Sequence, residues 1–267
     1  MERRPLRRIK RSEFVQDPVP WRPQRTNNRG HVWQQEELSP CYTSWVPPAN
    51  GTPRHSPPGE VQKVLFAITS CHKQRHYQQS QRETWIKDIP RCVDYKFFLG
   101  MPNTGDAAED EVFLGCGDGY YDLTDKTKAI CRWALEHGYT FIYKTDTDTL
   151  VYPTRLLECG FENWEYTGGK NTWFASGGSG YCLSKRAMQL VADDLDNCDW
   201  EDIFVEATMR KHGINLHDDR RFQWQGNATL TRETIAYHIS SIRGTGGPDN
   251  RYTPELMHRY YEEGKRK

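Results

Sequence analysis

The chain has 267 residues, of which 36% are hydrophobic, and this is enough to bury one sizeable core. Its 36 basic residues balance its 36 acidic residues, so no net field attracts nucleic acid, which is not an expected partner. The sequence contains no run of about 18 apolar residues, so we expect no transmembrane segment and favour a soluble, cytoplasmic protein, with the secretory pathway left open.

The chain divides by composition near residue 60. Residues 1–60 are rich in proline and arginine and show no sustained helical or strand period, so we expect a basic, largely extended arm. Residues 61–267 are expected to form one folded domain. It opens with apolar runs at 63–69 and 94–99, which are typical of buried strands, and a helix is predicted between them over 74–85.

A second helix and a third strand follow in the sequence. Thr124 is expected to cap a helix that ends at Gly138, and the apolar run 139–143 then leads directly to Asp146 and Asp148. Alternating strands and helices predict an α/β fold with a mostly parallel central sheet covered by helices. In such sheets, ligands bind at the carboxyl ends of the strands, where the two aspartates stand.

Further elements are predicted after the acidic pair. A strand over 172–176 is followed by Gly177 and Gly178, where a backbone could approach a ligand closely, although an ordinary turn explains them equally well. Ser184 is expected to cap a helix that runs to about residue 195. Another helix opens at residues 200–202 and ends at 213.

The acidic residues suggest a chemistry. Asp146 and Asp148 could hold a hard divalent cation through oxygen, and the cation could hold a diphosphate. Asp202 lies in the first turn of a helix, where a carboxylate often only complements the helix dipole. A metal-holding pair, a glycine turn and then a carboxylate able to act as a base is nevertheless the order of parts that a metal-dependent inverting sugar transfer needs.

Six motifs follow one another between residue 61 and about residue 240. They are 81–85 (QRETW), 96–100 (KFFLG), 120–127 (YYDLTDKT), 144–149 (KTDTDT), 175–184 (ASGGSGYCLS) and 201–205 (EDIFV). In these motifs and in their order, the sequence resembles the beta-1,3-glycosyltransferases, a family that includes Fringe and the beta-1,3-galactosyl- and N-acetylglucosaminyltransferases. The resemblance implies a single GT-A-like, Rossmann-like domain.

The resemblance also implies roles for individual residues. Asp148 matches the last acid of the family's DxD-type motif and is expected to bind manganese, or another divalent cation, with Asp146 contacting the metal or the nucleotide. Asp202 matches the catalytic base. His238 matches a late histidine that ligates the metal in several members, although a hydrogen-bonded histidine on a strand is the alternative. The implied partners are a UDP-sugar donor and a glycan, glycoprotein or other hydroxyl acceptor.

The donor side of the implied site includes three further residues. Arg82 matches an arginine near the donor pocket, where it could fix the site rather than contact substrate, and Gly177 and Gly178 are expected to face a sugar. The implied activity is an inverting transfer of galactose, N-acetylglucosamine or a similar sugar that forms a beta-1,3 linkage. The sequence departs from the family at Thr147, where members usually carry a third consecutive acid.

Two other functions remain open from the sequence. The segment 141–149 also fits the strand-DxDxT pattern of haloacid-dehalogenase-type phosphatases, with Asp146 as the nucleophile and the pairs 193–194 or 218–219 as later metal ligands. That motif normally ends the first strand of its domain, whereas two strands precede it here. The second alternative is a non-catalytic glycan-binding protein with this fold, against which the retention of Asp148 and Asp202 speaks.

Overall fold

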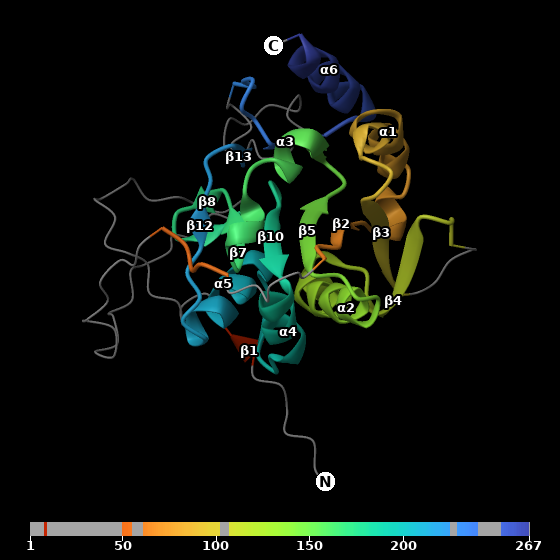
Figure 1. Cartoon of the computed structure of the whole chain (residues 1–267). Helices are drawn as coiled ribbons and strands as arrows, with labels where there is room; N and C mark the ends of the chain where they lie inside the picture. Colours follow the sequence, from red (N-terminus) through yellow and green to blue (C-terminus); the bar gives the residue numbers. More distant parts are fainter. Residues whose placement is uncertain are drawn as a thin grey trace, which may run out of the picture.

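The computed structural model describes residues 8–9, 50–54, 61–101, 107–224, 229–239 and 252–266. Within these ranges, a seven-stranded sheet forms the centre of the molecule, in the order β12-β7-β10-β5-β2-β3-β4 (Figure 1). Neighbouring strands are parallel except on both sides of β10. The predicted α/β fold with a mainly parallel sheet is therefore confirmed.

The bounds of the elements are as follows. The central sheet comprises β2 Val64–Thr69, β3 Asp94–Met101, β4 Glu111–Gly117, β5 Phe141–Asp146, β7 Tyr166–Gly168, β10 Tyr181–Ser184 and β12 His217–Asp218. The α-helices are α1 Tyr77–Glu83, α2 Leu123–Glu136, α3 Pro153–Leu157, α4 Lys185–Asp193, α5 Glu201–Lys211 and α6 Pro254–Lys265. The smaller strands are β1 Arg8–Ile9, β6 Thr149–Val151, β8 Lys170–Asn171, β9 Phe174–Ala175, β11 Asn197–Cys198, β13 Phe222–Gln223 and β14 Ala236–His238. The short 3-10 turns are η3 His72–Gln74, η4 Trp85–Asp88, η5 Tyr120–Asp122 and η6 Phe161–Asn163.

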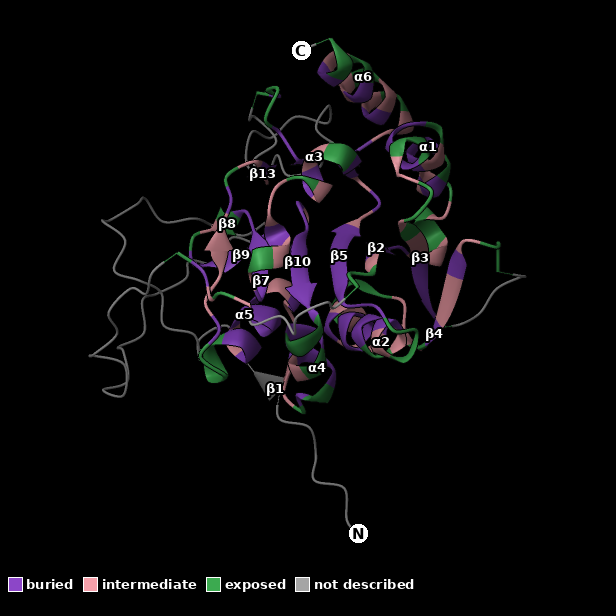
Figure 2. Cartoon of the chain, in the orientation of Figure 1, coloured by how far each residue is buried: buried purple, intermediate pink, exposed green. Residues whose placement is uncertain are grey.

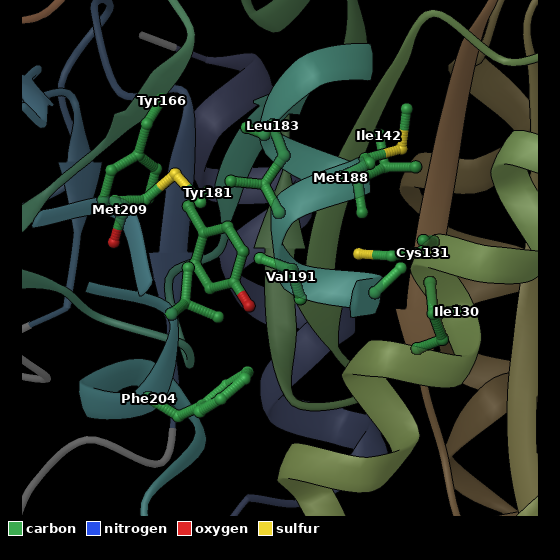
Figure 3. Packing of buried hydrophobic residues seen from close by; sticks show 14 of the residues in the cluster. Ile130, Cys131, Ile142, Tyr166, Tyr181, Leu183, Met188, Val191, Phe204 and Met209 are labelled. Atoms are coloured by element: carbon green, nitrogen blue, oxygen red, sulfur yellow. The ribbon is translucent and has the colours of Figure 1, made fainter. Parts of the chain in front are cut away.

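The sheet is covered on both faces, and its inner strands β2, β5, β7 and β10 are buried along almost their whole length, whereas the edge strands β4 and β12 are partly exposed (Figure 2). Side chains alternate along a strand, so Leu65 and Ala67 of β2 point into one apolar cluster while Phe66 and Ile68 point into another. The first cluster is closed by α2, α4 and α5, and Figure 3 shows part of it. The second is closed by η4, α3 and α6. A strand buried on both sides needs an apolar side chain at nearly every position, which is why these runs are recognisable in the sequence.

Several predicted elements are confirmed with shifted bounds. Ser184 caps α4 as expected, because its hydroxyl accepts a hydrogen bond from the Ala187 amide at 3.2 Å. The prediction that Thr124 caps the next helix is wrong, because α2 already begins at Leu123 with Asp122 at the capping position, and the Thr124 hydroxyl instead donates to the Cys198 carbonyl at 2.7 Å. The predicted helix over 74–85 is divided into η3, α1 and η4.

One predicted strand has a different role. The segment 172–176 contributes only β9, which pairs with β8 in a separate two-stranded ribbon. The strand that enters the central sheet is β10, which follows the glycine run and lies antiparallel to β5. The strand β10 consists of four residues, Tyr181 to the helix cap Ser184, which are too few to stand out as a strand in the sequence, although all four are buried.

Part of the predicted arm lies on the domain. Thr52 makes two hydrogen bonds with Asn215. The Thr52 backbone N–H donates to the Asn215 carbonyl at 3.0 Å, and the Asn215 backbone N–H donates to the Thr52 hydroxyl at 2.6 Å. The Arg54 guanidinium lies 4.5 Å from the centre of the Phe141 ring. The backbone of β1 pairs with β11. The arm's tryptophans and Tyr42 lie outside the described residues.

Among the residues that the structure describes, no helix is both long enough and apolar enough to span a bilayer.

Candidate functional site

The acidic turn, residues 146–149, connects β5 to β6 at the carboxyl end of the central sheet. Asp146 is the last residue of β5, and the turn reverses the chain within two residues. Asp146 and Asp148 are partly exposed, whereas Thr147 between them is buried. The Gln81 side chain of α1 donates to the carbonyls of Asp146 and Thr149 at 3.2 and 3.3 Å, and so holds both ends of the turn.

His238, which the family resemblance implies as a metal ligand, lies directly beside this turn. The strand β14 pairs antiparallel with β6, and the register puts His238 opposite Thr149. Its Nε2 lies 3.3 Å from Asp148 Oδ2. Burial has the largest single effect and lowers the pKa of His238, but the charge and hydrogen bond of Asp148, together with the charge of Asp146, more than offset it, and the pKa is raised. The protonated histidine is thus favoured, and in that form it makes a charge-assisted hydrogen bond to Asp148.

Asp148 and His238 provide a donor pair that a divalent cation could bridge. Two neighbouring ligands that each lie about 2.1 Å from a hard cation at right angles are about 3 Å apart, close to the observed 3.3 Å. Manganese accepts both carboxylate oxygen and imidazole nitrogen. Among the described residues, no group of three or more His, Cys, Asp and Glu side chains is arranged around a common point. A cation held here would take its remaining ligands from water or substrate.

Asp202 is placed by the first turn of α5. Its Oδ1 accepts a hydrogen bond from the Ile203 amide at 2.9 Å, an arrangement that fixes the carboxylate at the helix start. Burial and the neighbouring charge of Glu201 raise the pKa of Asp202 to about 7, although Lys144 opposes the shift. A carboxyl with a pKa near neutrality is poised to accept a proton at physiological pH.

Lys144 connects the two halves of the site, which are the acidic turn with His238 and the start of α5 with Asp202. It lies in β5, two residues before the acidic turn, and its ammonium contacts Asp146 Oδ1 at 2.9 Å and Glu201 Oε2 at 3.3 Å. Burial alone lowers the pKa of Lys144, but the two carboxylates outweigh it and raise the pKa above its ordinary value. The lysine is therefore a buried cation that ties the end of β5 to the start of α5.

Glu201 is the buried carboxylate that Lys144 contacts at the start of α5. Besides Lys144, its carboxylate accepts hydrogen bonds from the Tyr181 hydroxyl and from the Thr127 hydroxyl, the latter at 3.2 Å. Tyr181 lies in the first apolar cluster (Figure 3). Three elements, β5, β10 and α2, thus converge on one side chain that stands next to Asp202. A buried carboxylate is tolerable because each of its oxygens has a donor.

The glycine turn between β9 and β10 lies between the two halves. A Cβ on Gly177 would lie 2.6 Å from Glu201 Oε2 and 3.6 Å from the Asp202 Cβ. A Cβ on Gly178 would lie 2.3 Å from His238 Nδ1. The structure therefore explains both glycines by the chain's own packing, since a methyl group at either position would displace a site residue. Their expected contact with a sugar stays a prediction.

Arg82 contributes to the support of this region. Its guanidinium binds both carboxylate oxygens of Asp110, with Nε–Oδ2 at 2.7 Å and Nη2–Oδ1 at 2.8 Å, and it lies over the Phe97 ring. From the same helix it is Gln81, not Arg82, that reaches the acidic turn. A donor contact from Arg82 stays a prediction.

Three site residues were not singled out from the sequence: Lys144, Glu201 and Gln81. Lys144 does leave a signal, because it follows the apolar residues 141–143 in a strand buried on both faces, where a charge requires a buried partner. Glu201 stands in a helix first turn, where the dipole explains an acid without any partner. Gln81 leaves no signal in the sequence, because it contacts the backbone carbonyls of Asp146 and Thr149, which only the fold places next to α1.

The acids that a phosphatase of the haloacid-dehalogenase type would need are engaged elsewhere. Asp219 binds the Arg221 guanidinium at 2.6 Å. Asp194, at the end of α4, accepts from Thr208 at 3.2 Å and pairs with Lys211. Both carboxylates serve local ion pairs, so neither provides support for that alternative.

Comparison with known proteins gives one curated relative. The beta-1,3-galactosyltransferase 5 of Pan paniscus is 26% identical over 204 residues, which cover 58% of this chain and 67% of the relative. No family model matches the chain. The relative supports a glycosyltransferase-like function and thus a sugar-transferring enzyme. Donor and acceptor partners follow from that function as a class.

Two solved structures resemble the chain distantly. The apo-form glycosyltransferase GlyE of Streptococcus pneumoniae TIGR4 gives a TM-score of 0.45 at 12% identity, over 76% of this chain and 60% of the GlyE chain. A glycosyltransferase involved in glycosylation of the major capsid of PBCV-1 gives 0.41 at 11% identity, over 75% of this chain and 99% of its own. The chain thus spans about 60% of the GlyE length. Since both TM-scores lie below 0.5, we draw no conclusion from these likenesses.

Proposed function

We propose that the protein is a metal-dependent inverting glycosyltransferase that moves galactose, N-acetylglucosamine or a similar sugar from a UDP-sugar to an acceptor hydroxyl, forming a beta-1,3 linkage. The observation that carries the proposal is the joining of two chemically different halves. Two side chains that could hold a cation, Asp148 and His238, and a carboxylate with a pKa of about 7, Asp202, adjoin the same glycine turn. The relative's activity supports the same class of reaction.

In this proposal, Asp202 receives the proton of the acceptor hydroxyl. The acceptor oxygen forms a bond to the anomeric carbon, the bond from that carbon to the UDP oxygen breaks, and its electron pair leaves with UDP. Attack from the face opposite UDP inverts the configuration. Because the pKa of Asp202 is raised, the carboxylate is a stronger base than an ordinary aspartate while still being ionised in a large fraction near pH 7.

The leaving group departs from the other half of the site. A manganese ion bound by Asp148 and His238 would neutralise the charge that develops on the diphosphate. Asp146 is held by Lys144 and is expected to contact the nucleotide or the metal's surroundings. Gln81 keeps the backbone of the turn in place, so that Asp148 and His238 remain facing one another.

The proposal is tested by following UDP release from a panel of UDP-sugars, each incubated with a panel of glycan acceptors. We expect activity that requires manganese and is lost with chelator. Asp202→Asn should lower kcat by about 10²- to 10⁴-fold, the usual contribution of a general base. Asp148→Ala should abolish the response to manganese. Activity that is indifferent to chelator and to both substitutions would contradict the proposal.

The same preparation tests the phosphatase alternative. Release of p-nitrophenol from p-nitrophenyl phosphate by the parent, lost in Asp146→Asn, would favour a phosphatase. A protein that binds glycans but releases neither UDP nor phosphate would favour the non-catalytic alternative. The contacts of Asp194 and Asp219 give no reason to expect the first of these outcomes.

A further inference from the structure

The C-terminal helix α6 packs against the elements that surround the acidic turn, and it lies next to α1 (Figure 1). Three of these elements are in contact with it. They are α1, which carries Gln81, β6, which begins at Thr149, and β14, which ends at His238. The contact with β14 is made by the rings of Tyr237 and Tyr260, whose centres are 5.2 Å apart. A helix to which the proposed chemistry assigns no part is therefore packed around the cation side of the site.

Tyr252, two residues before α6 begins, links this helix to α1 by a hydrogen bond. Its hydroxyl lies 2.6 Å from the Ser80 hydroxyl, and both side chains are buried. Ser80 has one hydroxyl proton, which it donates to the Tyr77 carbonyl at 2.8 Å, so the Tyr252 hydroxyl is the donor to Ser80. The rings of Tyr252 and Tyr77 also pack edge to face at 4.6 Å. Burial raises the pKa of Tyr252, and the charge of Asp148 adds to the rise, so the phenol lies near the acidic turn.

Ser80 is the neighbour of Gln81 in α1, and Gln81 holds the acidic turn. The Gln81 side chain is buried, and its amide donates to the carbonyls of Asp146 and Thr149. These two carbonyls lie on either side of Asp148 in the chain. A displacement of α1 is therefore passed, through one side chain, to the backbone that carries the Asp148 carboxylate.

Small displacements matter at this point because two side chains must face one cation. Asp148 and His238 lie 3.3 Å apart, close to the separation that two ligands of one hard cation need. On one side the turn is fixed by the backbone, since the Ile239 amide donates to the Asp148 carbonyl at 3.1 Å. On the other side it is held by the side-chain hydrogen bonds of Gln81, and these depend on where α1 lies.

We propose that α6 positions the acidic turn, because the Tyr252–Ser80 hydrogen bond holds α1 and thus Gln81 in place, and that these two residues thereby set the affinity of the turn for its cation. Tyr252 and Ser80 are positioning residues. Both are buried, and they act through Gln81 and not on the cation itself. The identity of the cation as manganese rests on the proposed function, whereas the positioning of the turn does not.

The positioning is tested first without any ligand, by hydrogen–deuterium exchange of the full chain. Tyr252→Phe removes the hydroxyl and keeps the ring that contacts Tyr77. We expect amide exchange in peptides that span residues 146–151 to become about two- to tenfold faster, which corresponds to the net loss of one hydrogen bond. Ser80→Ala should have the larger effect, because it leaves the Tyr252 hydroxyl buried without this acceptor. The double variant should not exceed Ser80→Ala, because both changes remove the same bond.

Tyr261→Phe is the matched control. Tyr261 is a buried residue of the same helix, and its hydroxyl donates to Asp88 Oδ2 of η4 at 2.7 Å. The same change of one atom therefore removes one hydrogen bond of α6, but at η4 and not beside Gln81. We expect a loss of stability in urea similar to that of Tyr252→Phe, with exchange over residues 146–151 unchanged. Equal acceleration of that segment in both variants would overturn the proposal, because α6 would then only stabilise the fold. So would parent-like exchange in both Tyr252→Phe and Ser80→Ala.

Cation affinity gives the second readout. Binding of Mn²⁺ to the full chain is titrated by electron paramagnetic resonance of the free ion, with no sugar present. Tyr252→Phe and Ser80→Ala should raise the Kd for Mn²⁺ by about two- to tenfold, and Tyr261→Phe should match the parent. At saturating Mn²⁺, kcat of Tyr252→Phe should come within about twofold of the parent, because the base on α5 is unaffected. Parent-like Kd values in both variants would overturn the link between α6 and the cation.

The two proposals fail in different ways. A parent that binds no Mn²⁺ and releases no UDP, but whose acidic turn exchanges faster in Tyr252→Phe than in Tyr261→Phe, contradicts the transferase and its cation and leaves α6 as the element that positions the turn. A parent that transfers sugar, with exchange and Kd unchanged in Tyr252→Phe and Ser80→Ala, contradicts the positioning alone. Circular dichroism confirms that each variant is folded before it is compared.

Discussion

The two halves of the candidate site hold negative charge in different surroundings. The acidic turn is partly exposed, and Gln81, His238 and Lys144 contact it. The start of α5 carries a buried acid, Glu201, which shares Lys144 with Asp146 and also accepts from two buried hydroxyls. The acids of the turn are thus accessible enough to exchange partners with a cation, whereas Glu201 is suited to a fixed geometry. The acids expected to bind ligands, Asp146 and Asp148, therefore differ from the supporting acid, Glu201, in burial.

Removing the buried lysine should have the largest effect. Lys144→Met leaves Glu201 without its cation and Asp146 without its nearest contact. Breaking a buried ion pair on one side costs about 3–5 kcal/mol of unfolding free energy, because the remaining charge is buried and uncompensated. We expect that loss in urea denaturation, together with a lower kcat for the folded fraction.

Lys126→Met is the matched control for this change. Lys126 is equally buried and pairs with Asp118 at 2.8 Å, but its contacts are to the ends of β2 and β4 and not to α5. We expect a similar loss of stability with a smaller fall in kcat. Equal falls in kcat for the two variants, at equal folded fraction, would mean that Lys144 only stabilises the fold.

The glycine turn allows each half to be disturbed separately. Gly178→Ala places a methyl group 2.3 Å from His238, so the ring must shift and the manganese concentration for half-maximal activity should rise by about tenfold. Gly177→Ala instead crowds the Glu201 carboxylate at 2.6 Å and should lower kcat with little change in the response to manganese. A manganese titration of both variants measures this; identical titration curves would show that the halves are not separable.

The pKa of Asp202 predicts opposite effects on activity and stability. With a folded-state pKa of about 7 and an unfolded value of about 3.9, the folded protein binds the extra proton between these limits. The contribution of the protonated Asp202 carboxyl to the free energy of unfolding is therefore lost as pH rises from about 4 to about 7. Over the same range the ionised fraction of Asp202 increases, so kcat/KM should rise towards a plateau above about pH 7.

Asp202→Asn should separate the two effects. It removes the buried charge, so at pH 8 we expect it to be more stable than the parent by about 1 kcal/mol or more, a rise in Tm of about 2–4 °C, although it is inactive. At pH 4 the difference should vanish. Glu201→Gln serves as the comparison, because that acid has donors for both oxygens and its loss should destabilise the protein. A lower Tm for Asp202→Asn at pH 8 would contradict the raised pKa.

Part of this arrangement could be predicted from the sequence because it depends on local patterns. Strands buried on both faces are continuous apolar runs, so the sequence predicts β2, β3 and β5, and with them the position of the acidic turn. The family resemblance implies His238 as a metal ligand, and the register of β14 against β6 puts it beside Asp148. The sequence alone carries no signal for that pairing, since 90 residues separate the two side chains.

The remainder depends on contacts between distant segments. The strand β10 is four residues long, and nothing in its composition says that it runs antiparallel to β5. The roles of Lys144 and Glu201 follow from a contact across 57 residues. The apolar neighbours of Lys144 indicate that it needs a buried partner but not which one, and Glu201 alone is explained as an acid in the first turn of a helix. Such long-range pairs follow from topology and not from local residue preference.

Thr147 offers the smallest and most discriminating change. The beta-1,3-glycosyltransferases that the sequence resembles usually carry an acid there, so the sequence departs from their pattern at the centre of the acidic turn. In the structure this side chain is buried, unlike those of Asp146 and Asp148, so Thr147→Asp would introduce a desolvated carboxylate beside two existing acids. We expect a loss of about 1–3 kcal/mol in unfolding free energy and no tighter manganese binding. Thr147→Val is the matched control for removing the hydroxyl. If Thr147→Asp instead lowers the manganese requirement, the middle position reaches the cation, and the donor pair of Asp148 and His238 has to be extended to include it.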